Sequence, residues 1–129
     1  MKRLAAALTA VLLVAAPASA KSVPAKIWNC GKVVNQPVRL VLACGDGNLY
    51  FTNLKWKNWG AATATASGTD HLNDCTPYCA AGHFHTYSVR ITVDKLRPCG
   101  ITREYARLRY AYVKARPTVK ESLVYTMPC

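Results

Sequence analysis

The chain has 129 residues, of which 51% are hydrophobic and 18% charged, and its 17 lysines and arginines against 6 acidic residues give a net charge of +11. This length and composition exclude an intrinsically disordered chain, a collagen-like chain and a large multidomain enzyme with a separate cofactor domain. They indicate one small, strongly basic domain.

The beginning of the chain has the three parts of a secretory signal peptide. Positive charge at 2–3 precedes an apolar stretch over 4–16, and small residues at 18–20 fit a cleavage site. The apolar stretch is shorter than the ~20 residues that a membrane span needs, and no second apolar run follows it. The sequence therefore predicts a signal peptide over 1–20 and a single secreted domain over 21–129. We expect no transmembrane span after cleavage, and a location outside the cell or attached to the cell wall.

Six cysteines lie in the segment that we expect to be exported. An even number of thiols in an exported chain favours disulfide bonds. Sequence alone leaves many pairings open, and we favour Cys75 with Cys79, Cys44 with Cys99, and Cys30 with Cys129. We expect these cysteines to stabilise the fold rather than to act as nucleophiles.

A strand pattern runs through the rest of the chain. Period-2 alternation and β-favouring residues predict strands over 37–44, 49–59, 61–67, 83–93, 104–113 and 123–126, separated by a turn at 45–48, a loop over 68–82 and a break at 94–100. In the second strand, Tyr50, Thr52, Leu54 and Trp56 share one face of the pattern. No apolar period of 3.6 residues lasts for three turns, so we expect little or no helix. The prediction is an all-β fold, a small antiparallel β-sandwich or barrel held by disulfides, with its core at about 37–113 and further segments at both ends.

Three short segments carry a resemblance to a known group of proteins. They are CGDGN at 44–48, WKNWG at 56–60 and NDCTPYCAAGHF at 73–84. With these motifs the chain resembles uncharacterised small secreted proteins of high-GC Gram-positive bacteria. The resemblance covers about 40–113 and implies export and a disulfide-containing domain, but it implies no activity.

Three histidines and a carboxylate form a candidate metal site. His83 and His85 lie on one side of a predicted strand, about 6–7 Å apart, and His71 and Asp74 belong to the preceding loop. Neutral imidazoles beside a carboxylate suit Zn²⁺ or Cu²⁺. A structural role, with the histidine pair packed on the strand and His71 hydrogen-bonded in the loop, is the alternative. We expect no cofactor, except that zinc or copper could bind at these four residues.

The same histidines allow a small secreted hydrolase. Two imidazoles and a lysine could cleave RNA by general acid–base catalysis, although an H-x-H pair places its rings side by side rather than on opposite sides of a phosphate. The chain has no G-x-S-x-G, H-E-x-x-H or P-loop motif. We therefore predict no catalytic residue.

Positive charge is concentrated near the C-terminus. The candidate anion-binding residues are Arg103, Arg107, Arg109, Lys114 and Arg116, with Lys120 beside them. Such a stripe suits an anionic cell-envelope polymer, anionic lipid or, non-specifically, nucleic acid. A solvated sheet face that discourages aggregation is the alternative. The sequence favours a non-catalytic binding module for an anionic or cell-envelope partner over a histidine-centred metal-binding protein and over a small hydrolase.

Overall fold

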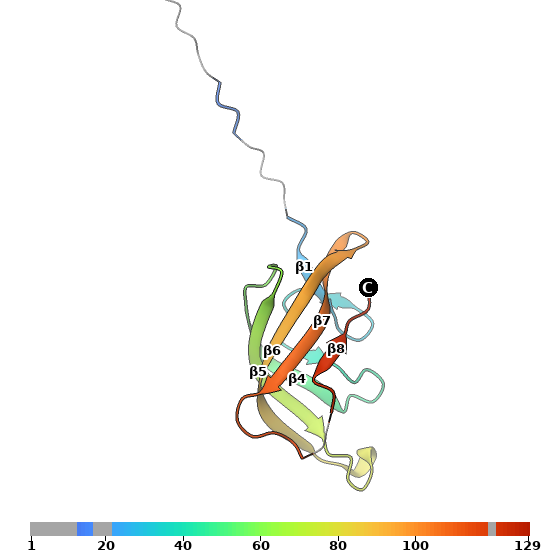
Figure 1. Cartoon of the computed structure of the whole chain (residues 1–129). Coiled ribbons are helices and arrows are strands. Elements are labelled where there is room, and N and C mark those ends of the chain that lie inside the picture. Colours follow the sequence, from blue (N-terminus) through green and yellow to red (C-terminus); the bar gives the residue numbers. More distant parts are fainter. Residues whose placement is uncertain (1–12, 17–21, 119–120) are drawn as a thin grey trace, which may run out of the picture.

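The protein forms one curled β-sheet with the shape of a half-barrel (Figure 1). The computed structural model describes residues 13–16, 22–118 and 121–129. In this part of the chain the strands are β1 (Ala25–Trp28), β2 (Val33–Val34), β3 (Leu40–Val41), β4 (Leu49–Lys57), β5 (Ala64–Asn73), β6 (Phe84–Cys99), β7 (Thr102–Tyr112) and β8 (Val124–Thr126). The one helical element among the described residues is a single 3-10 turn, η1 (Cys79–Ala81). The predicted all-β fold is confirmed.

The order of the strands places the longest ones at the centre. It runs β2-β1-β7-β6-β5-β4-β3, and β8 pairs with β7 (Figure 1). All neighbours are antiparallel except β1 and β7, which run parallel. Direct connections join the consecutive central strands, as antiparallel pairing allows, and the one between β5 and β6 contains η1. The long β5, β6 and β7 therefore form the frame that positions the outward-facing side chains.

Several predicted strand boundaries are wrong. β5 continues to Asn73 through the start of the predicted 68–82 loop, and β6 continues to Cys99 through the predicted break at 94–100. Backbone pairing with neighbouring strands sustains both extensions. Within β6, Lys95 adopts a positive φ of 55°, and the pairing with β7 resumes at Leu96. The predicted strand over 37–44 contributes only the two residues of β3.

A β-bulge changes the faces of β4. Thr52 pairs with Thr69, but Lys55 pairs with Ser67, so β4 holds one residue more than β5 between these pairs. Asn53 lies within the bulge and has a φ of 55°. As a result both Phe51 and Leu54 are buried, and the predicted shared face of 50, 52, 54 and 56 is wrong.

The inner, concave face of the sheet holds the hydrophobic core. Its largest fully buried apolar side chains are Tyr105, Phe51, Ile27, Leu40, Ile91, Leu108, Val89 and Val93. Ile27 and Met127 are buried too, so the core extends beyond the predicted 37–113 segment at both ends. Burial of apolar area on this scale is the dominant favourable contribution to folding.

Three disulfides fasten peripheral segments to this sheet. They join Cys30 with Cys44, Cys75 with Cys79, and Cys99 with Cys129. The predicted Cys75–Cys79 bridge is confirmed, whereas Cys44–Cys99 and Cys30–Cys129 are wrong. Cys99–Cys129 joins the turn between β6 and β7 to the C-terminal segment after β8. Cys30–Cys44 joins the turn after β1 to the segment after β3, and these strands lie at opposite ends of the strand order.

Most of the predicted signal peptide lies outside the described residues, because 13–16 are its only described part. Among the described residues, no helix is long and apolar enough to span a membrane.

Candidate anion-binding surface

The structure separates the predicted metal ligands. His71 pairs with Thr86 across β5 and β6, and the adjacent pair is Leu72 with His85. Because successive side chains of a strand point to opposite faces, His71 and His85 lie on opposite sides of the sheet. The two imidazoles therefore do not converge on one ion.

His71 belongs to a stack on the outer face. Its ring lies 4.5 Å from that of Tyr50 at an interplanar angle of 7°, and its Nε2 lies 2.8 Å from the Thr52 hydroxyl. The Arg39 guanidinium covers the Tyr50 ring at 4.4 Å. Burial, and then the positive charge of Arg39, lower the pKa of His71. These contacts fit the structural role that the sequence left open as an alternative.

The other predicted ligands form a small hydrogen-bonded loop. Asp74 accepts hydrogen bonds from the backbone N–H groups of His83 and Thr76, and its Oδ2 lies 2.8 Å from Nε2 of His85. These bonds, the one from His83 above all, lower the pKa of Asp74 to about 2. Within 13–16, 22–118 and 121–129, no three His, Cys, Asp or Glu side chains gather as a metal-binding group.

A partly buried acidic cluster lies on the inner face, and the sequence did not point to it. The Tyr112 hydroxyl lies 3.0 Å from Oδ2 of Asp70 and also contacts the carboxylate of Glu121. A phenol has a single hydrogen, so if both contacts are hydrogen bonds one carboxyl carries a proton. Burial raises the pKa of Asp70 to about 6, against the hydrogen bond from Tyr112. Burial also raises the pKa of Tyr110 and Tyr112.

This acidic cluster fits a structural role. Asp70 is fully buried, whereas a general acid has to reach its substrate. Oδ1 of Asp70 and the Tyr110 hydroxyl are buried with no hydrogen-bond partner in the described protein. The bond from Tyr112 to Glu121 ties the segment after β7 back onto that strand. No sequence motif marks Asp70, which looks like an ordinary polar loop residue in the sequence.

The outer face of the sheet is basic. Arg107 and Arg109 are on it, as predicted, and both bind Asp94, Arg107 through two bonds of 2.7 Å and Arg109 through one of 2.8 Å. The bonds from Arg107 are the main reason that the pKa of Asp94 is lowered. Bidentate pairing leaves Arg107 largely neutralised, while Arg109 makes a single bond to Asp94 and its side chain is 47% exposed.

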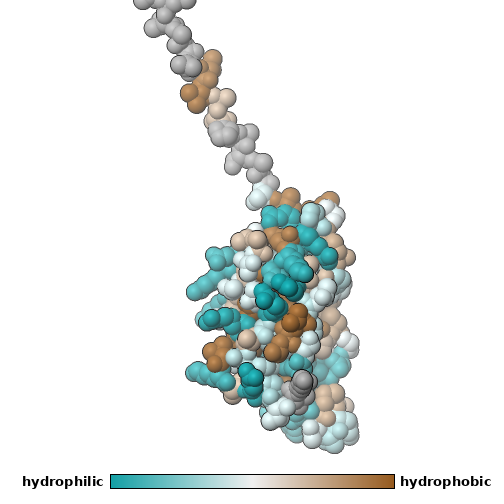
Figure 2. Space-filling model, viewed as in Figure 1, coloured by the Kyte–Doolittle hydropathy of each residue, from teal (hydrophilic) through white to brown (hydrophobic). Residues whose placement is uncertain are grey.

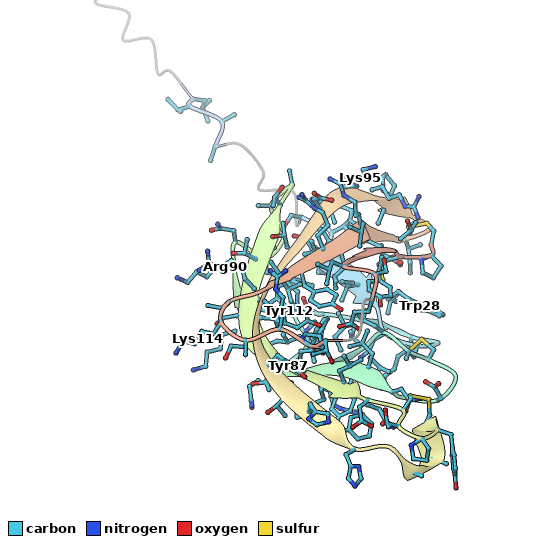
Figure 3. All side chains as sticks on the ribbon, turned by 60° about the horizontal axis from the view of Figure 1, so that its bottom comes forward. Trp28, Tyr87, Arg90, Lys95, Tyr112 and Lys114 are labelled. Atoms are coloured by element: carbon cyan, nitrogen blue, oxygen red, sulfur yellow. A yellow bond between two sulfur atoms is a disulfide. The ribbon has the colours of Figure 1, made fainter. Side chains whose placement is uncertain are left out.

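The remaining predicted cations are dispersed. Arg103 donates to the backbone carbonyl of Gly60 at 3.3 Å, near one end of the sheet. Lys114 and Arg116 are exposed in the segment that follows β7, and Arg116 lines a hollow with Tyr112 and Glu121. Lys120 lies outside the described residues. Figure 3 shows Lys114 on the same side of the molecule as Arg90.

Three further cations complete the basic face. Lys55, Lys57 and Arg90 line one hollow of about 340 Å³, together with the β5 residues Thr65, Ala66 and Ser67. No carboxylate lines this hollow, and no salt bridge of the described chain involves its three cations. The alternation of lysines at 55 and 57 is a sequence signal for an outward face, but only the strand register brings Arg90 beside them.

No family model, curated protein or solved structure matches the chain. The resemblance to small secreted bacterial proteins therefore stays a prediction.

Proposed function

We propose that the protein is a non-catalytic binding module whose outer sheet face binds phosphate or other anionic groups of the cell envelope. The hollow lined by Lys55, Lys57 and Arg90 carries this proposal. Cations that no carboxylate neutralises retain their full attraction for an anionic partner, and a concave site strengthens the local field. Three disulfides are compatible with a protein that works outside the cell.

The sheet register sets the spacing of these charges. Lys55, Ser67 and Arg90 form one row across β4, β5 and β6, and Lys57 begins the next row, which ends at Arg109 and Val124. Strands lie about 4.8 Å apart and alternate residues of a strand about 7 Å apart. The cations therefore form a grid of about 7–10 Å on a stiff support, which suits a surface or polymer with repeated anionic groups better than a single small anion.

The test removes the three cations and compares the variant with one of equal charge. Lys55→Thr/Lys57→Thr/Arg90→Thr keeps residues that favour strands. The control, Lys26→Thr/Lys32→Ser/Lys95→Asn, removes three positive charges elsewhere, with Asn at 95 because it tolerates the positive φ there. Figure 3 places Lys95 at the other end of the molecule from Lys114.

Retention on immobilised wall teichoic acid, a polyol phosphate polymer, is measured as the salt concentration that elutes each protein. We expect the hollow variant to elute at much lower salt than the control variant, because local charge rather than net charge determines a specific site. Equal elution of the two variants would show that the attraction is diffuse, and the proposal would be wrong.

A further inference from the structure

An apolar patch adjoins the cations on the outer face. Val113, Leu123 and Val124 are 55%, 39% and 52% exposed, which is unusual for three neighbouring aliphatic side chains. Ala111 links them, since it lines one hollow with Leu123 and Val124 and another with Val113. We define these four residues as the apolar patch. Figure 2 shows hydrophobic surface among hydrophilic side chains over this part of the molecule.

Cations surround the apolar patch. Arg90 and Arg109 line the hollow that contains Leu123 and Val124. Arg116 lines a neighbouring hollow with Ala111 and Leu123, which Glu121, in contact with the Tyr112 hydroxyl, also lines. Lys114 follows Val113 directly in the chain. The outer face therefore combines a small aliphatic centre with a rim of guanidinium and ammonium groups.

We propose that the anionic partner is a lipid bilayer with anionic headgroups, and that the apolar patch inserts among its acyl chains while the surrounding cations bind the headgroup phosphates. This inference rests on the proposed function and identifies the partner class of the same face. A soluble polyanion would use the cations and leave the patch in water. An anionic bilayer uses both, because aliphatic side chains gain free energy in the acyl boundary and basic side chains are attracted by the surface potential.

The arrangement on the sheet supports this docking. Val124 pairs with Arg109, so an aliphatic side chain and a guanidinium stand side by side on adjacent strands. Arg90 belongs both to this hollow and to the one with Lys55 and Lys57. One flat-lying contact of the outer face with a membrane surface would therefore engage the apolar patch and the cationic hollow together.

The test uses co-sedimentation of the protein with vesicles of phosphatidylglycerol and phosphatidylcholine, and with vesicles of phosphatidylcholine alone. We expect binding to the anionic vesicles only, weakened about fivefold for each cation removed in Lys55→Thr/Lys57→Thr/Arg90→Thr. Leu123→Thr/Val124→Thr should weaken it about tenfold. The matched control is Val38→Thr/Ile101→Thr, since these residues are 71% and 94% exposed and lie outside the patch.

A second variant reports insertion directly. Val113→Trp places an indole in the patch, and acyl chains brominated near the headgroup should quench its fluorescence beyond the quenching seen for the three native tryptophans of the parent protein. Thermal unfolding of each variant checks that the sheet is intact.

The outcomes separate the two proposals. If the apolar variant and its control bind anionic vesicles equally, or the new indole is not quenched, insertion is wrong. The proposed function still stands in that case, provided that the three-cation variant loses retention on teichoic acid. If that retention is also unaffected, the cationic face has no specific role and both proposals fail. Binding to a protein but not to vesicles would likewise overturn the lipid inference.

Discussion

A single carboxyl group gives the protein an unusual dependence on pH. Asp70 is fully buried, and its pKa rises from the ordinary 3.8 to about 6 on folding. Between these two pH values the folded chain keeps a proton on Asp70 that the unfolded chain has lost, so the contribution of Asp70 to the free energy of unfolding falls as pH rises from about 4 to 6. The shift of about two units corresponds to about 3 kcal/mol.

Asp70→Asn removes this ionisation and keeps a side-chain oxygen that can accept the hydrogen bond from the Tyr112 hydroxyl. We expect the difference in unfolding free energy, variant minus wild type, to rise by about 3 kcal/mol between pH 4 and pH 7. Urea unfolding at a series of pH values measures it. Groups such as His71, whose pKa is lowered on folding, titrate in both proteins and cancel in the difference. A difference that stays constant over this range would show that Asp70 is ionised at every pH above 4.

At the scale of a single strand pair, Gly68 is required by the bulge in β4. A Cβ at this position would lie 2.6 Å from Cδ2 of Leu54 and 2.9 Å from the carbonyl oxygen of Thr52. The leucine is buried and the carbonyl belongs to the backbone, so neither moves freely.

Gly68→Ala should therefore lower the unfolding free energy by about 1–3 kcal/mol, the usual cost of overpacking. Gly45→Ala is the matched control, because a Cβ there meets nothing within 4 Å and its φ is not positive. Chemical denaturation of both variants measures the effect. Equal stability of the two would mean that the bulge relaxes at no cost.

The bulge also shows where alternation stops being informative. The pattern identifies the buried face of β7 correctly over 107–110, with Leu108 and Tyr110 inward and Arg107 and Arg109 outward, but it fails at the start of the strand, where Glu104, Tyr105 and Ala106 are all buried. In β4 the extra residue shifts the faces, and neither Asn53 nor its neighbours mark it in advance. Similarly, β5 and β6 continue through polar sequence because their backbones stay paired with neighbouring strands, which composition does not reveal.

The candidate site is only partly visible in the sequence for the same reason. Clustering along the chain identified Arg107 and Arg109, but Asp94 from the neighbouring strand binds both. Lys55 and Arg90 are 35 positions apart in the chain and meet only through the register of β4, β5 and β6. At the scale of the whole molecule, a binding face on a sheet is assembled across strands, so sequence proximity identifies a part of it and misses the rest.

The disulfides act at this same scale, because Cys99–Cys129 fastens the C-terminal segment to the hairpin of β6 and β7 and Cys30–Cys44 links the two opposite edges of the curled sheet. Cys99–Cys129 closes a separation of 30 residues and holds the segment after β8, whereas Cys30–Cys44 closes one of 14 beside β2 and β3. The central strands β4 to β7 pair along most of their lengths without help from either bridge. We therefore expect the bridges to contribute mainly by restricting the unfolded chain.

Cys99→Ser/Cys129→Ser should lower the unfolding free energy by about 3–4 kcal/mol, and Cys30→Ser/Cys44→Ser by about 3 kcal/mol, while both keep the far-ultraviolet circular dichroism spectrum of the parent. Urea unfolding gives the two free energies. The first variant should also bind anionic vesicles more weakly, because β8 carries Val124 and its neighbouring segment would no longer be anchored to the hairpin of β6 and β7. Loss of the strand spectrum in either variant would show that the sheet depends on its bridges to form at all, and that the central strands are not the stable unit that their pairing indicates.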